Sequence, residues 1–220
     1  MRTTLVEHPN SLRAQQYVAN KYISLGQYQE ALTTQQNLAA KFPEHTSTQL
    51  SILNLSCLLN LTSADQVRTT LSILERSRFD TQIAGFLGPL ISNVTSGSCD
   101  ALGFAEIDAL FDALLRNPTM ARNATLRGIA HYFKGIAYQQ NGNLTGALEQ
   151  LDLSYAANAE IDIRFQEIVW LLAAGRPDEA ERYLILAQQH GKNKLLGRHT
   201  READLNILRQ RIAEAQKHTE

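Results

Sequence analysis

The chain has 220 residues, of which 44% are hydrophobic and 20% charged, so it can bury a large core. This composition excludes an intrinsically disordered or collagen-like protein. The chain has 21 lysine and arginine residues and 22 aspartate and glutamate residues, which gives a formal net charge of −1. No overall electrostatic field therefore attracts it to nucleic acid or to an anionic membrane.

Nearly every segment has a helical period, and none keeps the two-residue alternation of a strand. The first apolar stripe ends at Gly26, and the second runs from Tyr28 to Phe42 and stops at Pro43. The third, from Leu50 to Leu61, is apolar on all sides. A helix of this kind should be buried on all sides.

Helical patterns continue through the middle of the chain. Ser63 and Gln66 have the spacing of a capping box, which begins a helix. Pro89 lies inside a later stripe and predicts a kink or a break, because proline removes a helix hydrogen bond. The stretch from Ser96 to Gly103 is the expected central loop.

Two windows share one ordered set of residues, which indicates an internal repeat. The first contains Ala19, Tyr22, Gly26 and Ala31, and the second contains Gly135, Tyr138, Gly142 and Ala147. A weaker third copy contains Gly175 and Ala180, and Gly175 follows Gly142 by 33 residues. This set resembles the tetratricopeptide repeat (TPR), whose period is about 34 residues.

The resemblance implies a fold and its boundaries. We expect an all-α protein, an α–α hairpin solenoid in the form of a TPR-like superhelix, as a single domain spanning 1–220. TPR-like hairpins are expected at 12–45 and 128–192, and irregular helical hairpins at 46–127. A last helix at 198–217 would cap the solenoid, since Leu205, Leu208 and Ile212 lie on one of its faces.

The resemblance also implies a binding mode, in which a peptide lies along the concave face formed by the first helix of each repeat. Two sets of candidate peptide-binding residues follow from it: Arg13, Gln16 and Asn20 in the first repeat, and Tyr132, Ile136, Gln139 and Phe165 in the later ones. The second set lacks the lysines and asparagines of a carboxylate clamp. The favoured alternative is that Tyr132, Phe133, Ile136 and Phe165 pack on the central helices.

Catalytic and metal-binding patterns are missing from the sequence. It contains no HExxH, Walker loop, GxSxG or GxGxxG motif. The six histidines are scattered without metal-ligand spacing, and His131, beside Tyr132 and Phe133, is expected to be a packing residue. We therefore expect no enzyme, no metal and no cofactor.

Cys57 and Cys99 are the two cysteines, and their wide separation excludes a CxxC motif. They are either two buried thiols or one disulfide in an oxidising compartment, and nothing in the local sequence decides between these. No stretch of 18 apolar residues occurs, so we expect no membrane insertion by this chain.

Two interpretations of function follow. The first is a non-catalytic helical-repeat scaffold that binds a protein or peptide of unknown identity and does not bind nucleic acid. The second rests on the run from Val6 to Ala14, which is similar to the entry into the repeat tails of bacterial multi-span glycosyltransferases. In that setting the chain would be tethered to a membrane domain and face the periplasm, with Cys57 and Cys99 joined. A complete chain would instead be cytoplasmic.

Overall fold

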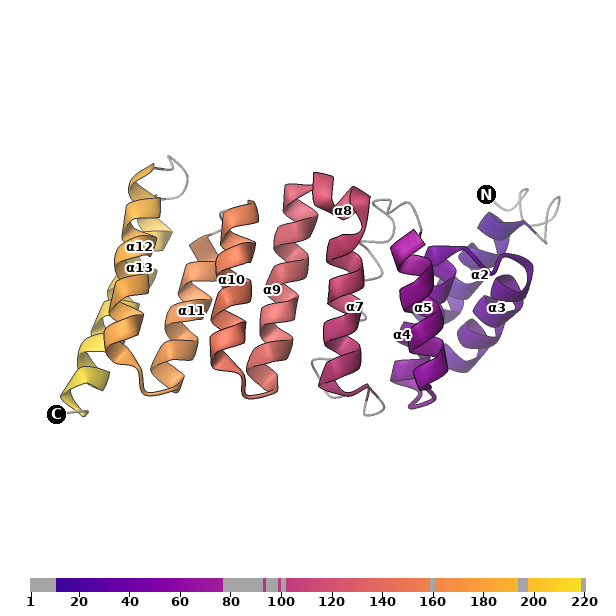
Figure 1. Ribbon diagram of the computed structural model, residues 1–220, viewed down its shortest axis with the longest axis horizontal. Helices are drawn as coiled ribbons and strands as arrows, with labels where there is room; N and C mark the ends of the chain where they lie inside the picture. The colour runs from indigo at the N-terminus through magenta and orange to yellow at the C-terminus, as the bar shows by residue number, and fades with distance from the viewer. Residues whose placement is uncertain are drawn as a thin grey trace. The chain divides into compact units, whose positions relative to one another are not determined.

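The computed structural model of the chain describes residues 11–76, 93, 99, 102–158, 161–193 and 198–218. Within these ranges every regular element is a helix, and each helix packs mainly against its neighbours along the chain (Figure 1). The predicted all-α class built from sequential hairpins is confirmed. Pro89, residues 1–10 and most of the predicted loop at 96–103 lie outside the described residues, so the kink stays a prediction.

The chain divides into two compact units, Met1–Leu126 and Arg127–Glu220. The helices of unit 1 are α2 (Leu12–Ser24), α3 (Tyr28–Lys41), α4 (Thr46–Leu58), α5 (Ala64–Arg76), α7 (Phe104–Arg116) and α8 (Pro118–Arg122). Those of unit 2 are most of α9 (Ala124–Gln140), α10 (Leu144–Asn158), α11 (Ile161–Ala173), α12 (Pro177–Asn193) and α13 (Arg198–Lys217). The division falls in α9, beside the 127/128 boundary where the sequence becomes TPR-like.

The turns at the ends of α2, α9 and α11 have one design. Gly26, Gly142 and Gly175 have φ values of 72°, 78° and 68°, in the left-handed region that glycine enters without strain. In each turn the residue after the glycine donates its backbone N–H to the carbonyl five residues earlier, as Asn143 does to Tyr138 at 2.9 Å. This is the Schellman arrangement, and it sets where the second helix of each pair begins.

A fourth turn of the same design ends α4 without a glycine. Asn60 has φ 54°, and Leu61 donates its N–H to the Ser56 carbonyl at 2.8 Å. Asparagine tolerates the left-handed region better than other side chains. Leu61 is 56% exposed because it follows this turn, so it does not continue the buried stripe predicted from Leu50.

Small residues let the paired helices approach closely. A Cβ added at Gly135 of α9 would lie 3.1 Å from the Ala147 carbonyl oxygen and 3.3 Å from a methyl of Leu151 on α10. Ala19 and Ala31 have no exposed surface in the first pair, and Ala180 has none in α12. The repeat positions that the sequence singled out are therefore packing positions.

The core of unit 1 is centred on α4. Leu50, Leu53, Leu55 and Cys57 are all at most 1% exposed, and Ile52 is 6% exposed. Ala31 and Leu32 of α3 pack against Ile52 and Leu55. Burial on both sides of α4 confirms the expectation for a helix that is apolar all round.

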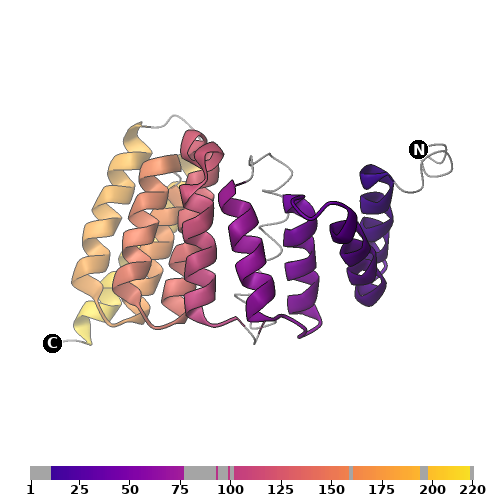
Figure 2. The same ribbon diagram turned by 45° about the vertical axis from the view of Figure 1, so that its right-hand side comes forward.

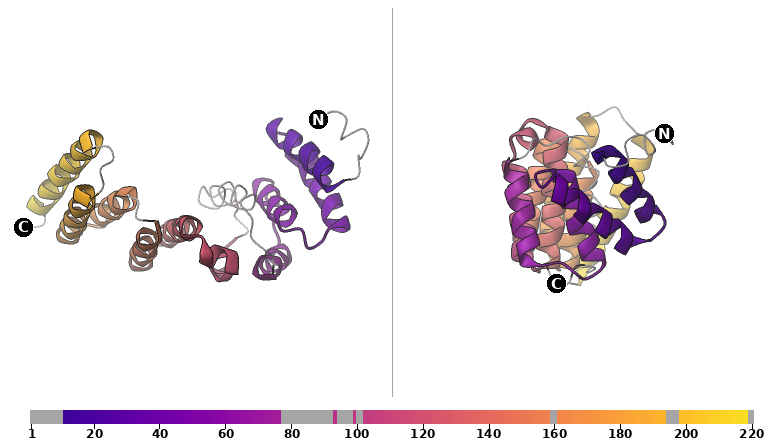
Figure 3. Two further views of the ribbon diagram at one scale, coloured as in Figure 1. Left: turned by 90° about the horizontal axis from the view of Figure 1, so that it is seen from above. Right: turned by 90° about the vertical axis from the view of Figure 1, so that its right-hand side faces the viewer.

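The core of unit 2 brings together α10, α11, α12 and α13. Ile168 and Leu171 of α11 are fully buried, and they pack with Leu208 and Ile212 of α13. The last three helices lie next to one another in the turned view and in the view from above (Figures 2 and 3). In the described part of the chain, no helix combines the length and apolarity needed to cross a bilayer.

Candidate functional site

The first candidate row lies on α2, which begins where Ser11 accepts a hydrogen bond from the Ala14 N–H. Arg13 and Asn20 are exposed on this helix, and Gln16 is half-buried. The Gln16 amide donates from Nε2 to Ser47 Oγ at the start of α4, at 3.2 Å. Gln16 is therefore engaged in linking α2 to α4, whereas Arg13 and Asn20 face the solvent.

The second candidate row lies on α9. Tyr132 and Ile136 are half-buried and Gln139 is exposed. Ile129 precedes Tyr132 by about one turn on the same face and is 43% exposed. Ile129 was not singled out from the sequence, although its spacing from Tyr132 and Ile136 could have revealed it.

The aromatic groups of this face have defined neighbours. The rings of Tyr132 and Phe133 are T-shaped, with centroids 5.4 Å apart. Burial raises the pKa of Tyr132, and the carboxylate of Asp162, in the first turn of α11, adds to the effect. The Tyr132 hydroxyl therefore lies within electrostatic range of the first turn of α11.

Phe165 of α11 is half-buried, and it packs with Val169 against the core of unit 2. Part of its ring is thus used for packing within unit 2. The candidate residues belong to both units: Arg13, Gln16 and Asn20 lie in unit 1, and Tyr132, Ile136, Gln139 and Phe165 in unit 2.

A polar cluster that the sequence did not indicate lies within unit 2. Arg164 of α11 is 8% exposed, and its Nη1 donates to Asp152 Oδ1 of α10 at 2.6 Å. The same nitrogen contacts both carboxylate oxygens of Glu167, at 2.9 and 2.8 Å. The guanidinium carbon is 4.0 Å from the ring centre of Tyr155 and 5.4 Å from that of Tyr183. We call Asp152, Arg164 and Glu167 the arginine cluster.

Burial dominates the electrostatics of the arginine cluster. Glu167 has no exposed surface, and desolvation raises its pKa to about 7, although Arg164 acts in the opposite direction. Burial alone would lower the pKa of Arg164, but hydrogen bonds to Asp152 and Glu167 more than reverse this, so its pKa is raised. Desolvation and the nearby carboxylates raise the pKa of Tyr183 to about 12. Arg164 and Tyr183 therefore keep their protons at neutral pH.

His131 lies on the side of α9 that faces α10. Its Nδ1 is 2.9 Å from Gln150 Oε1, an atom that can only accept a hydrogen bond. Burial, assisted by Lys134 and Arg127, lowers the pKa of His131. A neutral imidazole that donates to Gln150 fits a role in packing. Across the described residues, no group of three or more histidine, cysteine, aspartate or glutamate side chains could hold a metal ion.

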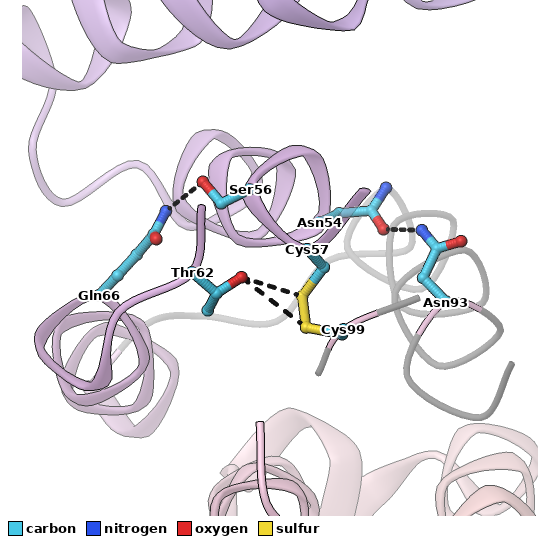
Figure 4. Close-up of a disulfide and its surroundings, with 7 residues drawn as sticks. All are labelled: Asn54, Ser56, Cys57, Thr62, Gln66, Asn93 and Cys99. Carbon is cyan, nitrogen blue, oxygen red and sulfur yellow. Dashed lines mark hydrogen bonds between the residues drawn. A yellow bond between two sulfur atoms is a disulfide. The ribbon is translucent and has the colours of Figure 1, made fainter. Parts of the chain in front are cut away.

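A disulfide joins Cys57 at the end of α4 to Cys99 (Figure 4). Their Cα atoms are 4.5 Å apart, and neither residue is more than 5% exposed. The Thr62 hydroxyl lies 3.5 Å from Cys57 Sγ and 3.7 Å from Cys99 Sγ. The Asn93 amide also reaches α4, where it donates to Asn54 Oδ1 at 2.6 Å. Residues distant in the sequence are thus held against the buried helix of unit 1.

Comparisons with known proteins give structural matches only. No family model matches the chain, and no curated protein matches it significantly. The crystal structure of MamA is similar, with 20% identity, a TM-score of 0.48, and coverage of 80% of this chain and 95% of that one. TTC0263, a thermophilic TPR protein of Thermus thermophilus, is 20% identical with a TM-score of 0.37, covering 98% of this chain and 86% of that one.

The repeat character of the chain rests on its own geometry. Two glycine turns 33 residues apart, at Gly142 and Gly175, start α10 and α12 in the same way. Buried alanines follow each of these turns, at Ala147 and Ala180. These helices of unit 2 thus form hairpins with TPR-like turns and packing positions.

Proposed function

We propose that this chain is a non-catalytic scaffold that binds a protein or a peptide through the face of α9 carrying Tyr132 and Ile136. The observation that carries the proposal is the incomplete burial of this apolar row. Ile129 is 43% exposed, Tyr132 and Ile136 are half-buried, and the exposed Gln139 follows them. Apolar surface of this kind, bordered by polar groups, is typical of interaction sites.

The chemistry of this row suits a peptide. Tyrosine combines a rigid apolar ring with a hydroxyl, which is why it is enriched at interfaces. Phe165 of α11 adds an aromatic group that its own packing holds in place, and sites on rigid helices lose little entropy on binding. In unit 1, Arg13 and Asn20 of α2 form a separate candidate, whose side chains are able to hydrogen-bond a peptide backbone or a carboxylate. TPR proteins are typically non-catalytic scaffolds, in keeping with this role.

Two exposed apolar residues of unit 2 allow a matched test. Ile129 on α9 is 43% exposed, and Leu153 on α10 is 47% exposed. Peptides are first selected from a displayed library on the immobilised full chain, and their Kd is then measured for the Ile129→Asp and Leu153→Asp variants. Loss of a central apolar contact typically costs more than about 1 kcal/mol, so Ile129→Asp should weaken binding by about tenfold.

Leu153→Asp is the control for a new charge on an equally exposed apolar residue, and it should change the Kd by less than about twofold. Circular dichroism of both variants checks that the helices are retained. Equal losses in the two variants, or none in Ile129→Asp, would contradict binding at the α9 face.

The disulfide favours a second candidate, in which the chain is the extracytoplasmic, TPR-like part of a larger bacterial membrane glycosyltransferase. Disulfides persist in oxidising compartments such as the periplasm and are rare in the cytosol, and Cys57 and Cys99 are joined. Mass spectrometry of alkylated, non-reduced protein from its native source tests this candidate. A mass showing two alkylated thiols would place the chain in a reducing compartment and exclude it.

A further inference from the structure

The arginine cluster contains two carboxylates and one cation, and one of the carboxylates is removed from water. Two carboxylates, those of Asp152 and Glu167, share the single Nη1 atom of Arg164. The Asp152 side chain is 51% exposed and can be solvated, whereas the Glu167 side chain has no exposure. Arg164 Nε is buried without a hydrogen-bond partner. One guanidinium nitrogen therefore serves as the donor to both carboxylates, while Nε contributes to neither.

The arginine cluster and its neighbours involve the helices α10, α11 and α12, and α13 packs against the core of α11. Arg164 of α11 contacts Glu167 directly and also bonds Asp152 of α10. The Tyr155 ring of α10 packs on the Arg164 guanidinium, and the Tyr183 hydroxyl of α12 donates to Asp152 Oδ2 at 3.4 Å. From α13, the apolar Leu208 and Ile212 pack in the core with Ile168 and Leu171 of α11. Arg164 is thus the one cation among the groups that contact these carboxylates in the described structure, and the fully charged cluster has a net charge of −1.

One proton on Glu167 removes this imbalance. Two carboxylates that compete for one positive group make it unfavourable for both to be ionised, and burial adds to the effect. The Asp152 side chain is 51% exposed, so water can solvate it while it stays paired with Arg164. A protonated Glu167 can still accept a hydrogen bond from Arg164 through its carbonyl oxygen.

We propose that the arginine cluster is a proton-sensitive joint, which takes up one proton as the pH falls through neutrality and then holds α11 more firmly between α10 and α12. The direction follows from linkage. Burial raises the pKa of Glu167 from 4.5 to about 7, so the folded state binds this proton more tightly than the unfolded state does. The contribution of Glu167 to stability is therefore greatest below its unfolded pKa and is lost as the pH rises through about 7.

Urea unfolding of the full chain as a function of pH tests the proposal, with Trp170 fluorescence reporting unit 2. Between pH 8 and pH 5, the unfolding equilibrium constant of the wild type should decrease at least about tenfold more than that of Glu167→Gln. Glutamine keeps the shape of the side chain and cannot take up the proton. Equal pH dependence in the two proteins would overturn the proposal.

A direct titration keeps the test valid if Glu167→Gln does not fold. Carbon-13 NMR of the glutamate carboxyls should give Glu167 a midpoint near neutrality. Asp152→Asn should lower this midpoint, because Glu167 is then the only carboxylate that pairs with Arg164. Glu149→Gln, an exposed change on the same helix α10, is the control and should not move it. A midpoint below about 5 in the wild type, or no response to Asp152→Asn, would also overturn the proposal.

Discussion

At the scale of single residues, the left-handed turn positions show how local chemistry determines the hairpins. Glycine can adopt a positive φ at no steric cost, and Gly26, Gly142 and Gly175 do so at the ends of first helices. The sequence pattern located these three positions. It did not locate Asn60, because asparagine occurs in many other conformations.

Replacement of Gly142 isolates the cost of this backbone conformation. A Cβ at this position would meet no atom within 4 Å, so Gly142→Ala introduces strain without a clash. We expect a loss of about 1 kcal/mol in the free energy of unfolding, measured with urea. Gly142→Asn should lose less, since Asn60 adopts the same region in this chain. An alanine variant as stable as the wild type would show that the turn does not require its left-handed residue.

At the scale of helices, periodicity predicted where the elements lie and how they pair. α4 is buried on both sides because both of its sides are apolar. The candidate binding rows were also placed on first helices, where the structure has them. What each residue of a row contacts was not predictable: Gln16 bonds to Ser47, and Phe165 packs into the core. These contacts depend on the angle at which neighbouring helices pack against each other, and the local sequence does not encode this angle.

At the scale of the whole molecule, each of the two units has a core of its own. The disulfide lies in unit 1, and the single tryptophan, Trp170, lies on α11 in unit 2. Units with separate cores can unfold in separate transitions. Circular dichroism would then report both units, and Trp170 fluorescence would report unit 2.

Removal of the disulfide should therefore affect one unit. For Cys57→Ala/Cys99→Ala, the chain-entropy model predicts a loss of about 4 kcal/mol in the stability of unit 1, because the bridge closes a loop of about 42 residues. In urea unfolding followed by circular dichroism, the transition of unit 1 should move to a lower urea concentration. The transition reported by Trp170 fluorescence should keep its midpoint. A parallel shift of the Trp170 transition would show that the two units unfold together.

The helical class, the glycine turns and the small packing residues could be predicted from the sequence, because helix periodicity and left-handed turns depend on residues within a few positions of one another. Only the tertiary structure revealed the arginine cluster. Arg164 and Glu167 are neighbours on one helix, but Asp152 and the two tyrosines come from α10 and α12. Which charges meet, and how far they are removed from water, depends on the packing of separate helices.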